Sequence, residues 1–214
     1  LPAEYFTQHN IALLAYDQRG FGDTQRRGIW GGQENLTRDL AEAVQAASRT
    51  YPDIPIYILG ESMGGAVAIA AMNSPVFPQK KVRGLILSSP ALWGDGAFNP
   101  FYRFLLWVTA HNFPEMKLTG RGLKIRASDN TEMLQALGRD PKVIKKTRID
   151  AVYGLVQMMD EALVELHMSR VPLLLLYGQH DQVIPHEAIR EALRRLRHPI
   201  TFAYYDTGWH MLLR

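Results

Sequence analysis

The sequence contains no cysteine, which excludes a disulfide framework, a thiolate zinc site and a cysteine nucleophile. It also lacks any apolar run near the ~18–20 residues that a membrane-spanning helix needs. The longest candidate covers only residues 104–110. A chain without cysteine fits the cytoplasm, where we expect this protein. Because the sequence starts at Leu1 rather than Met, we also expect that residues upstream of it are missing.

The sequence has no large excess of charge of either sign. The 214 residues carry 24 Lys and Arg against 21 Asp and Glu, a net charge of +3. This balance slightly favours anionic surfaces such as phospholipid headgroups, but it argues against nucleic acid as a partner. The sequence carries no signal for an oligomeric state.

Cofactor motifs are incomplete. Gly20-Phe21-Gly22 follows an apolar run, but Gln25 replaces the third glycine of a dinucleotide-binding loop. The sequence from His186 starts like the zinc-binding pattern H-E-x-x-H, yet Arg190 stands at the second histidine position. We therefore expect no metal and no organic cofactor.

Apolar runs alternate with helical patterns along most of the chain. The predicted buried strands are residues 11–16, 54–59, 82–88, 171–177 and 200–205. Helices are predicted from Asn35, as the capping residue, to Pro52, then over residues 63–72 and from Pro185 onward. This alternation predicts an α/β fold with a mostly parallel sheet and helices on both faces. The pattern is lost over residues 93–166, which predicts an insertion between the third and fourth strands.

Residues 60–64 read Gly-Glu-Ser-Met-Gly, a G-x-S-x-G element between a predicted strand and a predicted helix. In this context the motif predicts a nucleophile elbow, in which Ser62 sits on a sharp, strained turn. Side chains at Gly60 and Gly64 would collide in such a turn, and Gly65 would allow close packing of helix on strand. The alternative is a glycine-rich turn that only packs.

A serine nucleophile needs a general base, and the base needs an orienting carboxylate. Among the seven histidines, His210 follows the last predicted strand through a short loop that can reach the edge of the sheet near Ser62. Asp181 follows the preceding strand and is our candidate acid, in the chain order nucleophile, acid, histidine. His180 is a rival candidate for the base, and Asp206 and Asp95 are rival candidates for the acid.

Stabilisation of an oxyanion requires two donors. The backbone N–H of Met63, the residue after the nucleophile, is the first. The second normally comes from a loop after an earlier strand, and no His-Gly loop is present. We expect it upstream of Leu1 or from another source.

Four segments together carry a family resemblance: YDQRGFGDT (16–24), GESMGG (60–65), LLLYGQHDQVIP (174–185) and GWHMLL (208–213). They resemble the monoacylglycerol lipase and lysophospholipase branch of the α/β-hydrolases. The resemblance implies an α/β-hydrolase core of residues 1–92 and 167–214 and a helical cap, or lid, of residues 93–166. It also implies that the N-terminal strands and most of the C-terminal helix are truncated. Ser62, Asp181 and His210 take the triad positions.

By the same resemblance, the substrate is a carboxylic ester of a monoacyl lipid, either a monoacylglycerol or a lysophospholipid. In such enzymes the cap shapes a channel for an acyl chain. The cap candidates for lining that channel, or for lying on a membrane surface, are Phe101, Phe104, Leu105, Trp107, Met158 and Met159. The alternative is that these side chains only pack the cap onto the sheet.

Other activities share this triad and remain open at this point. They are proline iminopeptidase, carbon–carbon bond hydrolase, cofactor-free haloperoxidase and acyltransferase. A non-catalytic binding protein on the same fold is an alternative of a different class, since a fold does not fix a function.

Overall fold

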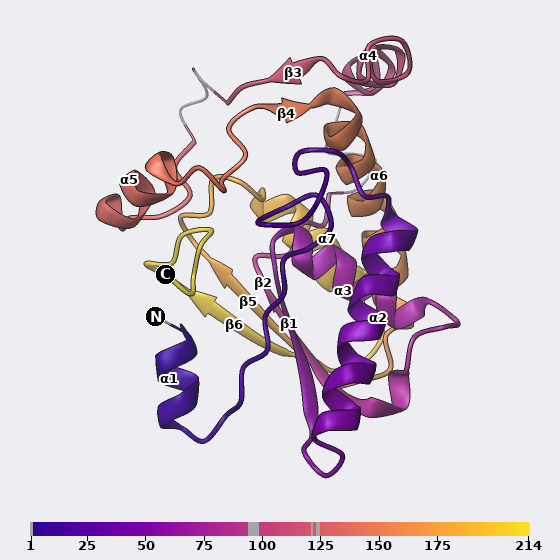
Figure 1. Cartoon of the computed structure of the whole chain (residues 1–214), viewed down its shortest axis with the longest axis vertical. Coiled ribbons are helices and arrows are strands. Elements are labelled where there is room, and N and C mark those ends of the chain that lie inside the picture. Colours follow the sequence, from indigo (N-terminus) through magenta and orange to yellow (C-terminus); the bar gives the residue numbers. More distant parts are fainter. Residues whose placement is uncertain (1, 94–98, 121, 123–124) are drawn as a thin grey trace.

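The computed structural model describes the whole chain except residues 1, 94–98, 121 and 123–124 (Figure 1). Its centre is a parallel sheet of four strands in the order β1-β2-β5-β6. The strands are β1 (Ile56–Glu61), β2 (Val82–Ser88), β5 (Leu173–Gly178) and β6 (Thr201–Tyr205). Four of the five predicted strands are confirmed, each within two residues at either end.

The prediction of a strand over residues 11–16 is wrong. This segment has no regular secondary structure, and Ile11, Leu13 and Leu14 are exposed. An apolar run becomes a strand only where a neighbouring strand takes up its backbone hydrogen bonds. No strand that the structure describes pairs with residues 11–16.

The core helices are α2 (Gln33–Thr50), α3 (Met63–Asn73), α6 (Ile149–Glu165) and α7 (His186–Arg195), and a short helix α1 (Pro2–Gln8) lies apart from them (Figure 1). Single turns of 3-10 helix, η1 (Gln79–Lys81) and η2 (Leu166–Met168), lead into β2 and β5. Asn35 does not cap α2 as predicted. The capping position is Gly32, and the Asn35 amide donates to the carbonyl of Gly31 at 2.8 Å. No helix in the described part of the chain is long and apolar enough to cross a membrane.

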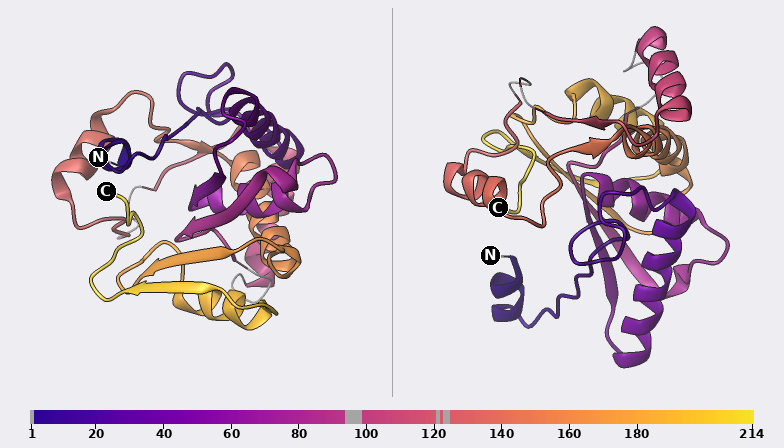
Figure 2. Two further views of the ribbon diagram at one scale, coloured as in Figure 1. Left: turned by 90° about the horizontal axis from the view of Figure 1, so that it is seen from below. Right: turned by 45° about the horizontal axis from the view of Figure 1, so that its top comes forward.

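The sheet has one well-covered face. Helices α2, α3, α6 and α7 all contribute to one buried cluster on that face. Figure 2 shows how these helices lie around the sheet. Ile58 and Leu85, paired across β1 and β2, are buried there. Leu59 and Ile86, the next pair along the strands, point to the other side and are only partly buried, while Tyr57 on that side is 59% exposed. The predicted cover of helices on both faces is therefore seen on one face of the described structure.

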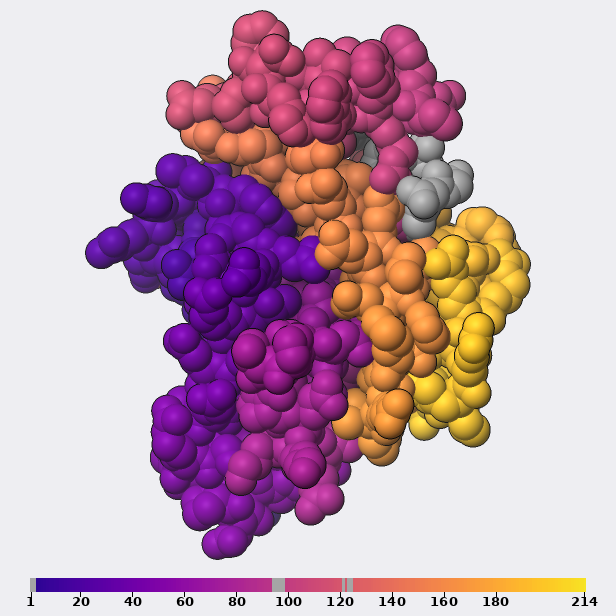
Figure 3. Space-filling view, turned by 90° about the vertical axis from the view of Figure 1, so that its right-hand side faces the viewer, coloured from indigo at the N-terminus to yellow at the C-terminus, as the bar shows by residue number. Residues whose placement is uncertain are grey.

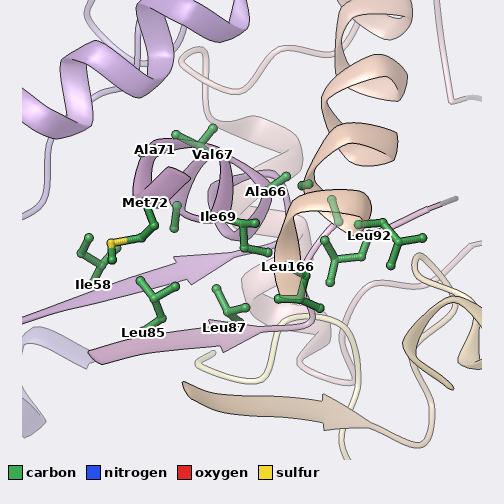
Figure 4. Packing of buried hydrophobic residues seen from close by; sticks show 14 of the residues in the cluster. Ile58, Ala66, Val67, Ile69, Ala71, Met72, Leu85, Leu87, Leu92 and Leu166 are labelled. Carbon is green, nitrogen blue, oxygen red and sulfur yellow. The ribbon is translucent and has the colours of Figure 1, made fainter. Parts of the chain in front are cut away.

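Helix α3 is the centre of the core. Its run of small and aliphatic residues is buried almost all round, because α2, α6 and the sheet surround it. Figure 4 shows Ile69 of α3 above Leu85 and Leu87 of β2, with Leu166 close by. A helix that is apolar on every side is typical of a fully enclosed position. The helix that begins at Met63 is thus held firmly in the core.

The predicted insertion contains α4 (Pro100–Asn112), β3 (Lys117–Leu118), α5 (Thr131–Arg139) and β4 (Thr147–Arg148), and it ends with α6. Strands β3 and β4 pair antiparallel. Helix α4 lies at the outer edge of the molecule, above α6 (Figure 3). The described segments agree with a helical cap, and its boundaries at residues 93 and 166 stay a prediction.

Helix α6 links this insertion to the core. Its first half contacts the core loop at Gly154, where an added Cβ would run into the indole ring of Trp30. Its second half packs against α3 and places Met158, Met159 and Leu163 in the main buried cluster. Helix α6 also contacts α4 and β4 of the insertion, so one continuous helix has contacts with both parts.

Candidate active site

Ser62 lies between the end of β1 and the start of α3, in a backbone conformation that residues other than glycine rarely adopt. Its φ is 51° and its ψ is −119°. The turn is fixed on both sides: the Ser62 N–H donates to the Ser88 carbonyl at 3.0 Å, and the Ser62 carbonyl accepts from Ala91 at 2.9 Å. A strained residue persists only where its surroundings determine it. The predicted strand-to-helix turn at Ser62 is thus present, with the strain expected of a nucleophile elbow.

The glycines of the motif differ in what they permit. A Cβ on Gly60 would lie 2.6 Å from the Gly64 carbonyl oxygen, and a Cβ on Gly65 would lie 2.7 Å from the Cβ of Pro90. A Cβ on Gly64 would meet nothing within 4 Å. The steric requirement predicted for Gly60 is confirmed, as is close packing at Gly65. The one predicted for Gly64 is wrong, because a Cβ at this position would meet nothing outside its own helix.

His210 and Asp181 lie together in the interior. The Nδ1 atom of His210 is 2.9 Å from Oδ2 of Asp181, and the residues are 6% and 5% exposed. The second carboxylate oxygen, Oδ1, accepts backbone N–H groups of Val183 at 2.8 Å and Ile184 at 2.9 Å. Burial by itself raises the pKa of the Asp181 carboxyl, but the hydrogen bond from His210 and those from the two amides outweigh it and hold the pKa below its ordinary value. Asp181 is therefore suited to orient a histidine while remaining ionised.

Two glycines allow the loops carrying these residues to meet. A Cβ on Gly178, at the end of β5, would lie 2.4 Å from the carbonyl of Gly208. The His180 N–H donates to the Gly208 carbonyl at 2.8 Å, so the acid loop and the histidine loop form one unit. The side chain of His180 points elsewhere and packs at 5.5 Å against Trp209.

The three predicted triad residues come from strands that run in the same direction. Ser62 follows β1, Asp181 follows β5 and His210 follows β6. The carboxyl ends of parallel strands lie at one edge of the sheet, which is where open α/β sheets bind ligands. The structure brings Asp181 and His210 into contact, and the Ser62 hydroxyl has no hydrogen-bond partner among the described residues. The contact between Ser62 and His210 stays a prediction.

In the described structure, neither rival candidate for the acid is seen in contact with His210. Asp206 is exposed at the end of β6, and Asp95 lies outside the described residues.

Met63 is the first residue of α3, a position whose N–H has no partner within its helix, which suits the predicted role as an oxyanion donor. No three His, Asp or Glu side chains in the described part of the chain are grouped to hold a metal ion.

Glu61 is a residue of this site that the sequence analysis overlooked. It directly precedes Ser62, and its Oε1 atom is buried without a hydrogen-bond partner among the described residues. Burial raises the pKa of the Glu61 carboxyl, and its interactions with Arg214 and His210 act in the opposite direction. Nothing in the pattern G-x-S-x-G marks its second position, so only the surrounding structure reveals this carboxyl.

A second overlooked feature is the cap segment that borders the histidine loop. The Met211 N–H donates to the Ala127 carbonyl at 3.0 Å, and the Arg126 N–H donates to the side chain of Gln182 at 2.8 Å. The Arg126 guanidinium also lies 5.1 Å from the ring centre of Trp209. This part of the insertion thus forms a wall beside Asp181 and His210.

The predicted cap residues fall into two groups. Phe101, Phe104, Leu105 and Trp107 of α4 are exposed, and their predicted role in the cap stays a prediction. Met158 and Met159 are buried in the core cluster beside α3. The two methionines pack against the core, as the alternative has it, because α6 turns that face toward α3. A role for them in an acyl channel stays a prediction.

Comparisons with known proteins agree with this geometry. The Hydrolase_4 family model, described as serine aminopeptidase S33, matches residues 2–214. A monoglyceride lipase of Mus musculus is 29% identical over 96% of this chain and 68% of its own length. Phospholipase YtpA of Bacillus subtilis is 30% identical over 85% of this chain and 69% of its own length. The chain thus spans about two thirds of the length of these relatives.

Among solved structures, the monoacylglycerol lipase of Paleococcus ferrophilus superposes with a TM-score of 0.79. It is 22% identical and covers 97% of this chain and 78% of its own. The fold and the site together define an α/β-hydrolase with a serine at the elbow. The chain belongs to the Hydrolase_4 family, among its lipase-like and esterase-like serine hydrolases.

Proposed function

We propose that this protein is a serine esterase that cleaves carboxylic esters of monoacyl lipids, monoacylglycerols or lysophospholipids, through an acyl-enzyme. The observation that carries the proposal is the buried hydrogen bond between His210 and Asp181, at the sheet edge where Ser62 lies on its strained turn. Nucleophile, base and orienting acid are the parts that such chemistry requires.

The hydrogen bonding supports one step for each group. Asp181 binds Nδ1–H of His210, which leaves Nε2 to accept the proton of the Ser62 hydroxyl as its oxygen attacks the ester carbonyl. The Met63 N–H stabilises the resulting oxyanion. His210 then protonates the departing alcohol, and a water molecule deprotonated by the same nitrogen releases the fatty acid from Ser62.

The substrate class rests on the relatives and on the cap. The two relatives described above are named as a monoglyceride lipase and a phospholipase. Helix α4, which lies at the outer edge of the molecule (Figure 3), carries Phe101, Phe104 and Trp107, and all three are exposed. An exposed aromatic helix suits the boundary between a lipid phase and water, so we include peripheral contact with a membrane surface in the proposal.

Labelling with a fluorophosphonate probe tests the nucleophile. The protein should react with the probe, and Ser62→Ala should abolish labelling and reduce kcat by about 10⁴–10⁶-fold on p-nitrophenyl esters. Ser74→Ala, a serine at the other end of α3, should change neither. A retained rate above about a tenth of wild type would refute the role of Ser62.

A series of acyl chain lengths tests the substrate class. We expect kcat/KM to rise from p-nitrophenyl acetate to the longer acyl esters and 1-monoacylglycerols to be hydrolysed. A strong preference for acetate would contradict the lipid assignment. Turnover of amino-acid p-nitroanilides in place of esters would favour the aminopeptidase reading that the family's description names.

A further inference from the structure

A hollow lies at the opposite end of the sheet from Ser62. It is a pocket of about 820 Å³ whose walls are residues 167–172 and 197–199. The first segment leads into β5 and the second into β6, so both lie at the amino ends of parallel strands. The triad residues follow the carboxyl ends of the same sheet, so the hollow is separate from the site described above.

The walls of this hollow are basic. His167, Arg170, Arg197 and His198 line it, and none of its lining residues is Asp or Glu. Neither arginine forms an ion pair or a side-chain hydrogen bond with any residue that the structure describes. Elsewhere the arginines of α7 pair with glutamates, as Arg194 does with Glu191 at 2.8 Å. Two unpaired guanidinium groups on one hollow are a ready partner for an anion, above all for phosphate, whose geometry a guanidinium matches with two hydrogen bonds.

Two buried polar atoms give independent evidence for a ligand. Ser169 is only 3% exposed, and its hydroxyl has no hydrogen-bond partner among the described residues. The Nε2 atom of His198 is also buried without a partner in that part of the chain. Both residues line the hollow. Folded proteins rarely leave buried polar groups unsatisfied, and such exceptions often mark a missing ion or ligand.

We propose that this hollow binds a phosphate group, held by Arg170 and Arg197 and hydrogen-bonded by the Ser169 hydroxyl and the His198 imidazole. The phosphate group belongs either to a soluble phosphate ester or to a phospholipid headgroup. The site is independent of the proposed esterase activity, because none of its residues lies at the Ser62 edge of the sheet.

Calorimetric titration of the full chain with inorganic phosphate and with glycerol 3-phosphate, at constant ionic strength, tests the site. We expect a dissociation constant of about 1 mM or lower for glycerol 3-phosphate. Arg170→Gln and Arg197→Gln should each weaken binding at least about tenfold, and Ser169→Ala several-fold. Arg49→Gln, an exposed arginine on α2, is the matched control and should leave binding unchanged. Both site arginines are exposed, so their replacement should not unfold the protein. The circular dichroism spectra of the variants should therefore match that of wild type.

Vesicles with and without phosphatidic acid form the second arm. Binding of the soluble ester identifies a free ligand, whereas binding of phosphatidic acid vesicles alone, lost in Arg170→Gln, identifies a lipid headgroup. No binding in either arm would overturn the proposal. Equal binding by wild type and by the Arg170→Gln, Arg197→Gln double variant would overturn it too.

Discussion

The Nδ1 atom of His210 and the Oδ2 atom of Asp181 lie 2.9 Å apart, from loops 29 residues apart in the chain. Both residues are almost fully enclosed, and Asp181 receives two further N–H groups from its own loop. The carboxylate is thus fixed before any substrate arrives, and it fixes in turn which nitrogen of His210 faces outward. Such preorganisation is what a general base needs, because the geometry does not have to be formed during the reaction.

Replacing Asp181 tests whether this bond supports catalysis. In Asp181→Asn the side-chain amide can offer the Nδ1 atom of His210 a donor, which favours the wrong imidazole tautomer. We expect kcat on p-nitrophenyl esters to fall about 10⁴-fold with the fold retained. Asp206→Asn, at the exposed rival acid, should leave kcat within about twofold of wild type. The reverse ranking in steady-state assays would move the acid role to Asp206.

The turn at Ser62 predicts opposite outcomes for two glycines of one motif. Gly60→Ala forces a methyl group against backbone atoms of Gly64 and Gly65, which cannot move without disturbing α3. We expect a loss of about 1–3 kcal/mol in the free energy of unfolding, measured with urea. Gly64→Ala places its methyl group in open space within a helix and should be neutral or stabilising by up to about 1 kcal/mol. Equal losses in the two variants would show that the turn is not as tight as described.

Glu61 predicts a pH-dependent stability. Because burial raises its pKa in the folded protein, the folded state holds a proton that the unfolded chain releases near its ordinary pKa of about 4.3. Stability therefore falls as the pH rises through the window between the two pKa values, and the loss persists above it. Glu61→Gln has no proton to lose, so its Tm should exceed that of wild type at pH 8 and match it near pH 4.

Thermal melts between pH 4 and pH 8 measure this effect. Glu42→Gln, an exposed glutamate on α2, should show no such trend. A lower Tm for Glu61→Gln at pH 8 would mean that attraction to Arg214 and His210 outweighs the cost of burial. The glutamate would then stabilise the site.

Helix α4 predicts binding to lipid surfaces. Trp107 is 47% exposed and stacks with Phe104 at 6.3 Å, so the two rings form one apolar patch. Burying such a ring contributes about 1.5–3 kcal/mol, and about 1.4 kcal/mol corresponds to a tenfold change in affinity. The double variant Phe104→Ser, Trp107→Ser should sediment with phospholipid vesicles at least about tenfold more weakly. Tyr51→Ser, an exposed aromatic after α2, is the control, and equal losses in both would argue against docking through α4.

The elements that were predictable from sequence are those in which local and tertiary signals agree. The strand at residues 82–88 is an apolar run, and the elbow around Ser62 adds Gly60 at a position where a side chain does not fit. Both lie where they were expected. Asp181 and His210 were predicted because their loops follow neighbouring strands of one sheet. The structure places these two side chains in hydrogen-bond contact. Their catalytic roles and the reach of His210 to Ser62 stay predictions.

Other features depend on neighbours that no local pattern reveals. Residues 11–16 are as apolar as β5, but a strand is defined by its partner, and these residues have none in the described structure. The methionines of α6 carry the same signal whether they face solvent or α3, so only the orientation of the helix decides. Glu61 shows the same limit, since its burial follows from the whole fold.

Helix α6 has one last consequence. Near its start it touches Trp30, along its second half it lies against the helix that begins beside Ser62, and its end runs through η2 into the basic hollow at the base of β5. A helix that is packed at three places cannot tilt at one of them without disturbing its contacts at the other two. The insertion, the turn at Ser62 and the hollow at the amino ends of β5 and β6 are therefore linked through one helix.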